Sequence, residues 1–190
     1  MISKAMKGRL KEFGYAWIFK EVYYRIRSDL ASPVNIPNWL QEQLLSFDGL
    51  AYDKVPIFKD KNDDVKMVKI LRWVVAHIKY TRDFDKWRKL EYWQRWDETI
   101  LSGTGDCEDM TTLVYAIAFY NHINVLQMAH TCGKVVGGGH CWLEYQAFED
   151  NISYLIDAAY WPDLDLIPNR ETFSSDSRYL TRWWRTGVTL

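Results

Sequence analysis

The chain has 190 residues, of which 48 % are hydrophobic and 26 % charged, as expected of a soluble globular protein with a sizeable core. The formal net charge is −1, so no overall field favours nucleic acid or an anionic membrane, and no apolar run reaches the roughly 20 residues of a membrane span. Aromatic residues make up 16 % of the chain, including ten tryptophans, which indicates an aromatic core or cleft.

A short apolar stretch near the N-terminus bears on export. It runs for seven residues, from Phe13 to Phe19, and is followed by Lys20 without a small-residue cleavage site. These features differ from those of a signal peptide, so we expect a cytoplasmic protein. In that compartment Cys107, Cys132 and Cys141 are expected to be reduced thiols.

Helical spacing of apolar residues dominates the first two thirds of the chain. Residues 4–29 carry an amphipathic pattern, and a short helix is expected from about Asn38. A longer helix is predicted to begin near Asp63, with an apolar stripe that reaches Ile78. A buried helix is expected to end at about Tyr120, after a segment rich in aromatic and charged residues.

The periodicity changes after Asn121. Three runs rich in branched and aromatic residues predict strands over 125–136, 141–148 and 154–158. Three glycines join the first two strands, and residues 149–151 suit a hairpin turn between the second and the third. Helices followed by an antiparallel sheet predict an α+β fold.

One cysteine lies between acids in the stretch Gly103-Thr-Gly-Asp-Cys-Glu-Asp109. Its two glycines permit a tight turn, and Asp106 is suited to cap the helix that follows. Cys107 then falls in the first turn, where free N–H groups and the macrodipole favour a thiolate. The neighbouring carboxylates oppose ionisation, so a reactive Cys107 needs a cationic partner. The alternative is a small buried hydrophobic residue.

A histidine and an aspartate further along could supply that partner. On the strand that His140 begins, His140 and Trp142 share a face, and on the next strand Leu155 and Asp157 share a face. If a loop of two or four residues closes the hairpin, His140 and Asp157 lie on the same side, opposite or diagonal. The alternatives are a loop histidine satisfied by water and an aspartate that merely ends a strand.

These residues together resemble the transglutaminase-like superfamily of papain-fold cysteine enzymes, close to its bacterial and phage-encoded cysteine proteinases. The resemblance covers about residues 65–162. It is carried by residues 103–109, by His140-Cys-Trp142 and by Tyr154-Leu-Ile-Asp157-Ala, with the upstream segments Glu91-Tyr-Trp-Gln94 and Glu98-Thr99-Ile100.

The resemblance implies a papain-like core in which N-terminal helices pack on an antiparallel sheet and the nucleophile begins a helix. Cys107 would be the nucleophile, His140 the general base and acid, and Asp157 the group that orients His140. The implied domain is a single one, made of a helical N-terminal extension (1–60), a catalytic core (63–162) and a tail (163–190).

An oxyanion hole is also implied, formed by the backbone N–H of Cys107 and by a side-chain donor from upstream. Gln94, Trp93 and Trp96 are the candidate donors, and the sequence does not choose among them. Trp96 stands where related sequences often carry proline, which puts the upstream loop geometry in question. Cys141 replaces a commoner alanine and is expected to face away from the site.

A cation site is the second implication. Asp106, Glu108 and Asp109 match the acids that bind calcium in one branch of the superfamily, and carboxylate oxygens suit calcium. The alternative is that Asp106 caps the helix while the other two acids complement its dipole. No cofactor is otherwise expected. Zinc is not expected, because His130 and Cys132 lack a second ligand pair and the sequence contains no C-x-x-C. The absence of C-x-x-C also argues against the glycan-removing branch, which resembles this core but carries a cysteine-rich zinc site.

The implied function is cysteine-dependent acyl transfer from an amide through a thioester, with a peptide or protein as substrate and no nucleic acid partner. Hydrolysis makes the protein a peptidase or amidase, whereas a second amine as acceptor makes it a cross-linking transglutaminase. A third interpretation is a non-catalytic protein-binding or virion-associated module built on the same fold.

Overall fold

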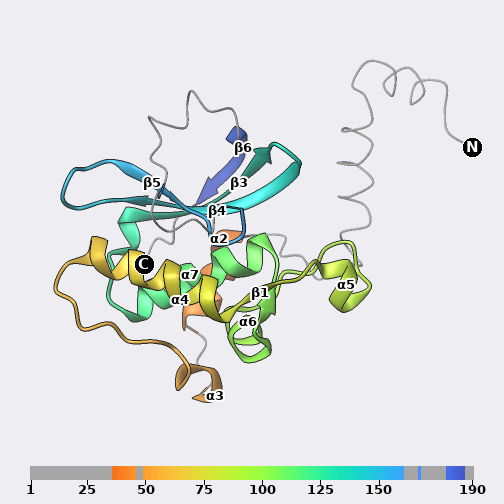
Figure 1. Cartoon of the computed structure of the whole chain (residues 1–190), viewed down its shortest axis with the longest axis horizontal. Helices are drawn as coiled ribbons and strands as arrows, with labels where there is room; N and C mark the ends of the chain where they lie inside the picture. Colours follow the sequence, from red (N-terminus) through yellow and green to blue (C-terminus); the bar gives the residue numbers. More distant parts are fainter. Residues whose placement is uncertain (1–35, 46–48, 161–166, 168–178, 187–190) are drawn as a thin grey trace, which may run out of the picture.

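The computed structural model describes residues 36–45, 49–160, 167 and 179–186 (Figure 1). The predicted amphipathic helix over residues 4–29 lies outside the described residues, as does much of the chain after residue 160. Within the described part, no helix has the length and apolar character needed to cross a membrane.

Helices make up the first half of the described chain. The helix predicted near Asp63 is α4, which Asn62 caps by accepting the backbone N–H of Asp64 at 2.8 Å. The buried helix predicted to end near Tyr120 is also present, and the short helix predicted from Asn38 begins slightly earlier. The helical elements are α2 (Ile36–Leu45), α3 (Gly49–Tyr52), α4 (Asp63–His77), α5 (Asp83–Trp87), α6 (Trp96–Ser102), α7 (Cys107–Tyr120) and the 3₁₀ turn η1 (Val125–Gln127).

An antiparallel sheet of order β5-β4-β3-β6 follows the helices, which confirms the α+β class. Residues 125–127 form η1 rather than strand, and Gly138 and Gly139 belong to β4 instead of the turn. The edge strand β6 is an element that the sequence pattern does not predict. The strands of this sheet are β3 (Met128–Val135), β4 (Gly138–Gln146), β5 (Ser153–Ile156) and β6 (Tyr179–Thr186).

The core lies between this sheet and the helices, which gather beneath one face of the sheet in Figure 1. Helix α7 is at its centre, because it contacts β3 and β4 as well as α4 and α6. Leu143 of β4 faces this core, whereas Trp142 packs on the other face with Val135 and Leu155. The alternation predicted for this strand is therefore present, and both of its faces are buried.

Two cysteines meet across the β3–β4 hairpin. Cys132 and Cys141 are direct partners in the register, with Cα atoms 4.1 Å apart, and are joined as a disulfide. The expectation of reduced thiols is wrong for this pair, because strand register is set by tertiary structure and cannot be read from cysteine count. Cys107 is free, as expected.

Cys141 also points toward the helices, where Cys107 packs against the same core cluster. Cys141 thus lies on the face of β4 opposite to His140 and Trp142, in accord with the predicted alternation.

Candidate active site

The turn before α7 is fixed by a small parallel sheet. Strand β1 (Lys79–Tyr80) pairs with β2 (Thr104–Gly105), and the N–H of Thr81 donates to the carbonyl of Gly105 at 2.9 Å. A Cβ on Gly105 would lie 2.7 Å from the Cβ of Asp109, so only glycine allows the strand to approach α7 this closely. The chain is thus anchored two residues before Cys107.

Cys107 is the first residue of α7, and its thiol lies between acids and the sheet. The Sγ atom is 3.1 Å from Oε2 of Glu108. Burial raises the pKa of the thiol well above its usual value, and the carboxyl groups of Glu108 and Asp106 raise it further. The backbone N–H of Cys141 donates a hydrogen bond to the thiol, and this contact lowers the pKa of the thiol. That contact brings the nucleophile candidate beside the residue that follows His140.

His140 and Asp157 meet on the face of β4 that carries Trp142. The Nε2 atom of His140 lies 2.6 Å from Oδ2 of Asp157, and both side chains are buried. Asp157 follows β5 directly, and its other oxygen accepts the N–H groups of Ala159 and Tyr160 at 3.1 and 2.9 Å. The predicted proximity of these two residues across the hairpin is therefore present.

Aromatic rings fix the plane of the imidazole. The ring centroid of His140 is 6.2 Å from that of Trp142 and 5.3 Å from that of Tyr160. Burial raises the pKa of Asp106, and the charge of His140 is one of the smaller effects that oppose the rise, which puts the imidazole near the N-cap of α7. The structure thus brings Cys107, His140 and Asp157 to one place, where the start of α7 meets β4.

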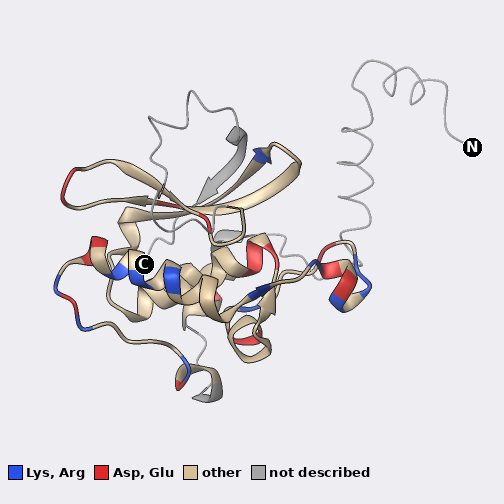
Figure 2. Cartoon of the chain, in the orientation of Figure 1, with Lys and Arg blue, Asp and Glu red and all other residues tan. Residues whose placement is uncertain are grey.

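A buried cluster of acids lies on the other side of the thiol. Besides Asp106, Glu108 and Asp109 it contains Asp83 from α5 and Glu91, and their carboxylate oxygens approach within 4.8 Å in groups of three. Figure 2 marks the acidic residues of α5 and of the start of α7 in this part of the molecule. Asp83 and Glu91 are the members that sequence reasoning missed, because no local pattern links them to the Cys107 motif.

Mutual repulsion and burial make this cluster hold protons. Burial raises the pKa of Asp83 to about 8 and that of Asp109 to about 7, and the charge of Asp106 adds to both shifts. The pKa of Glu108 is raised well above its usual value for the same two reasons. Such a group of acids is stable at neutral pH only when protons or a cation offset its charge.

The donor set fits a hard cation. Within the acid cluster, three buried carboxylate oxygens receive no hydrogen bond from the described residues, namely Oδ1 of Asp83, Oδ1 of Asp106 and Oε1 of Glu108. Asp83 belongs to one group with Asp106 and Asp109 and to another with Glu91 and Glu108, and both groups offer oxygen ligands alone, as calcium requires.

Asp109 is placed differently from the rest of the cluster. It accepts the backbone N–H groups of Gln94 at 2.7 Å and of Asp106 at 3.2 Å, so its oxygens already brace the turn.

The three predicted oxyanion donors all donate elsewhere. The amide of Gln94 donates to Asp109 and to the carbonyl of Thr104. The indole N–H of Trp93 donates to Oε1 of Glu91 at 2.7 Å. The structure therefore shows the side-chain donors of Gln94 and Trp93 committed to acceptors within the fold.

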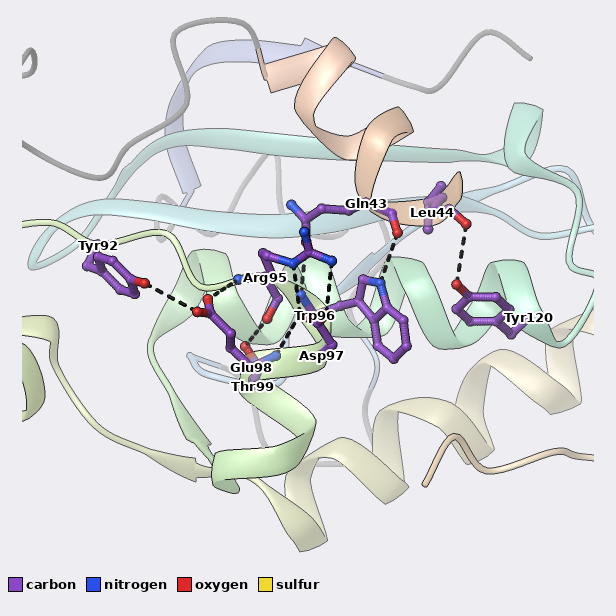
Figure 3. A network of polar contacts seen from close by, with 9 residues as sticks. All are labelled: Gln43, Leu44, Tyr92, Arg95, Trp96, Asp97, Glu98, Thr99 and Tyr120. Atoms are coloured by element: carbon purple, nitrogen blue, oxygen red, sulfur yellow. Dashed lines mark hydrogen bonds and ion pairs between the residues drawn. The ribbon is translucent and has the colours of Figure 1, made fainter. Parts of the chain in front are cut away.

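Trp96 is held against α2, as Figure 3 shows. Its indole N–H donates to the carbonyl of Gln43 at 3.1 Å, and its backbone N–H donates to Oε1 of the same residue at 2.9 Å. Trp96 is the first residue of α6, a position that proline also favours, so the departure noted in the sequence leaves the start of this helix intact.

Comparison with known proteins gives a likeness of structure alone. No family model matches the sequence, and no curated protein matches it significantly. Legionella pneumophila LapG matches with a TM-score of 0.56 and 17 % identity, over 82 % of this chain and 86 % of that one. Its EGTA-treated and calcium-bound structures match with the same TM-score and identity, over 82 % and 79 % of this chain and 83 % of each of theirs. At this identity the likeness establishes a shared fold.

Proposed function

We propose that the chain is a cysteine-dependent peptidase or amidase with Cys107 as nucleophile, His140 as general base and acid, and Asp157 as the group that orients His140. The observation that carries the proposal is the buried contact between His140 and Asp157, together with the hydrogen bond from the backbone N–H of Cys141, the residue after His140, to the free thiol of Cys107 at the start of α7. The fold shared with LapG supports the same conclusion.

In this proposal each ring nitrogen of His140 has its own role. Asp157 holds Nε2, so Nδ1 is left to take the proton of the Cys107 thiol. The thiolate attacks the amide carbonyl carbon, and the C–N bond breaks as His140 returns the proton to the leaving amine. Water then attacks the thioester with His140 as base, which releases the acid and restores the thiol.

Electrostatics at the thiol explain why a cation belongs to the proposal. Glu108 and Asp106 disfavour the thiolate, so their charge has to be offset before His140 can remove the proton efficiently. Asp106 and Glu108, with Asp83, would hold calcium through their free oxygens. Bound calcium would supply positive charge beside the nucleophile. LapG structures in calcium-bound and EGTA-treated forms support this choice of ion.

A peptide-library cleavage screen tests the function. The wild-type protein is incubated with the library in calcium and in EGTA, with and without a primary amine, and the products are identified by mass spectrometry. We expect hydrolysed peptides that are absent with Cys107→Ala. Products that carry the amine instead of water would assign the transferase reaction, and cleavage that persists in Cys107→Ala would overturn the proposal.

A further inference from the structure

A tyrosine beside the nucleophile is not used in the mechanism above. Tyr80 is the second residue of β1 and pairs with Gly105, two positions before Cys107. The flanking N–H groups of Lys79 and Thr81 donate to the carbonyls of Gly103 and Gly105, each at 2.9 Å. The backbone of Tyr80 is therefore fixed to the same turn that positions the thiol.

The side chain of Tyr80 is open to solvent and to the site. It is 48 % exposed, although it is a large aromatic residue in the middle of the chain. Its hydroxyl makes no hydrogen bond within the described residues, in contrast to the hydroxyls of Tyr145 and Tyr154, which donate to aspartates. Among the described residues, no contact accounts for the hydroxyl group of Tyr80.

The surroundings of the hydroxyl are those of the nucleophile. Burial is the largest influence on the pKa of the Tyr80 phenol, and the nearby groups that raise it further are Cys107, Asp106 and Glu108. Burial and these negative neighbours raise the pKa of the phenol, so it stays protonated and can donate a hydrogen bond at neutral pH. The phenol therefore combines a free donor with a position beside the thiol.

Attack by Cys107 on a carbonyl creates an oxyanion that needs more than one donor. The N–H of Cys107 is the first, because the first residue of a helix has no intrahelical acceptor for it. The side chains of Gln94, Trp93 and Trp96 already donate within the fold. The second donor is thus unassigned, while one free donor lies next to the thiol.

We propose that the hydroxyl of Tyr80 is the side-chain donor of the oxyanion hole, acting with the backbone N–H of Cys107. The assignment rests on the proposed function and extends it by one catalytic residue. Helix α7 contacts β4, which carries His140, and also β2, the strand that pairs with the one carrying Tyr80. A carbonyl on the thiol would then have its leaving group toward His140 and its oxygen toward Tyr80.

The test removes only the hydroxyl. With the best peptide from the library screen as substrate, Tyr80→Phe is expected to lower kcat by about 100-fold or more and to leave KM nearly unchanged. The rate of Cys107 alkylation by iodoacetamide should stay within about twofold of wild type, because that displacement forms no oxyanion. Tyr154→Phe is the matched control, since it removes an exposed hydroxyl bonded to Asp150 and far in sequence from the site.

Each outcome decides the assignment. A loss of kcat in Tyr80→Phe with an unchanged alkylation rate supports it. A loss of affinity of Tyr80→Phe for a peptide aldehyde by the same factor as the loss of kcat also supports it, because the aldehyde adduct carries the same oxyanion. Unchanged cleavage by Tyr80→Phe overturns it, and so does a parallel fall in cleavage and alkylation, which would mean that Tyr80 acts on the thiolate. Wild-type protein that cleaves no peptide would instead remove the proposed function itself.

Discussion

The imidazole of His140 and the carboxylate of Asp157 meet across the β4–β5 hairpin, with Nε2 of the histidine 2.6 Å from Oδ2 of the aspartate. The two residues are 17 positions apart and both are buried, Asp157 to 1 % exposure. A buried carboxylate in this position holds one tautomer of the histidine and stabilises the imidazolium formed during proton transfer.

Replacing Asp157 by asparagine keeps the shape but exchanges the carboxylate oxygen for an amide. The amide oxygen can still accept from Ala159 and Tyr160, so the turn should fold. An N–H facing Nε2 favours the wrong tautomer, and kcat for peptide cleavage should fall by roughly 10³- to 10⁴-fold. Asp150→Asn, on an exposed turn, serves as the control. Activity of Asp157→Asn within tenfold of wild type would contradict the role given to this aspartate.

Calcium should stabilise the protein through the acid cluster. At a concentration of about 100 times the Kd, binding adds roughly 2.7 kcal/mol to the free energy of unfolding, which for a chain of this length is about 5–10 °C in Tm. Thermal unfolding in calcium and in EGTA measures the difference. Glu108→Gln should abolish most of it, since it removes a charge and weakens one of the free oxygens. Asp60→Asn, which affects only an ion pair with Lys69, should respond like wild type. An equal response in both variants would place the ion elsewhere.

The pH dependence of stability without metal follows from the same cluster. Asp83 and Asp109 have folded-state pKa values of about 8 and about 7, above the 3.8 of an unperturbed aspartate. The folded protein therefore holds protons that the unfolded chain releases, so this contribution is complete below about pH 4 and is lost as pH rises to about 8. In EGTA, we expect the Tm of wild type to fall between pH 5 and pH 8. Asp83→Asn should flatten that slope, and a wild-type Tm that rises over this range would show the acids to be ionised in the folded state.

The disulfide between Cys132 and Cys141 can be tested by counting the cysteines that iodoacetamide modifies. Iodoacetamide added to the denatured, unreduced protein should modify Cys107 alone, whereas prior reduction should expose all three cysteines. Reduction should also lower the Tm, because a closed loop of this size restricts the unfolded chain and so adds roughly 2–3 kcal/mol to the free energy of unfolding. Intact mass before and after reduction gives the number of labels. Three labels without reductant would restore the expectation drawn from the sequence.

Local sequence patterns were sufficient to locate the helices and strands that hold the candidate catalytic residues. The spacing of apolar residues was enough to predict α4 and α7, because a helix that packs on a core repeats its apolar residues every three or four positions. The glycines and acids around Cys107 placed that residue at a helix start by turn and capping preferences alone. Alternation along the strands even put His140 and Asp157 on one side of a hairpin, since the side-chain period of a strand is two.

The residues that join them from distant parts of the chain could not be identified without the tertiary structure. Asp83 and Glu91 enter the acid cluster, and Tyr80 reaches the turn before Cys107, through strand pairing and packing between segments far apart in the chain. The same holds for the pairing of Cys132 with Cys141 and for the edge strand β6, whose register no local pattern encodes. Periodicity describes one element at a time, whereas burial, repulsion between acids and access to the thiol depend on how the elements meet.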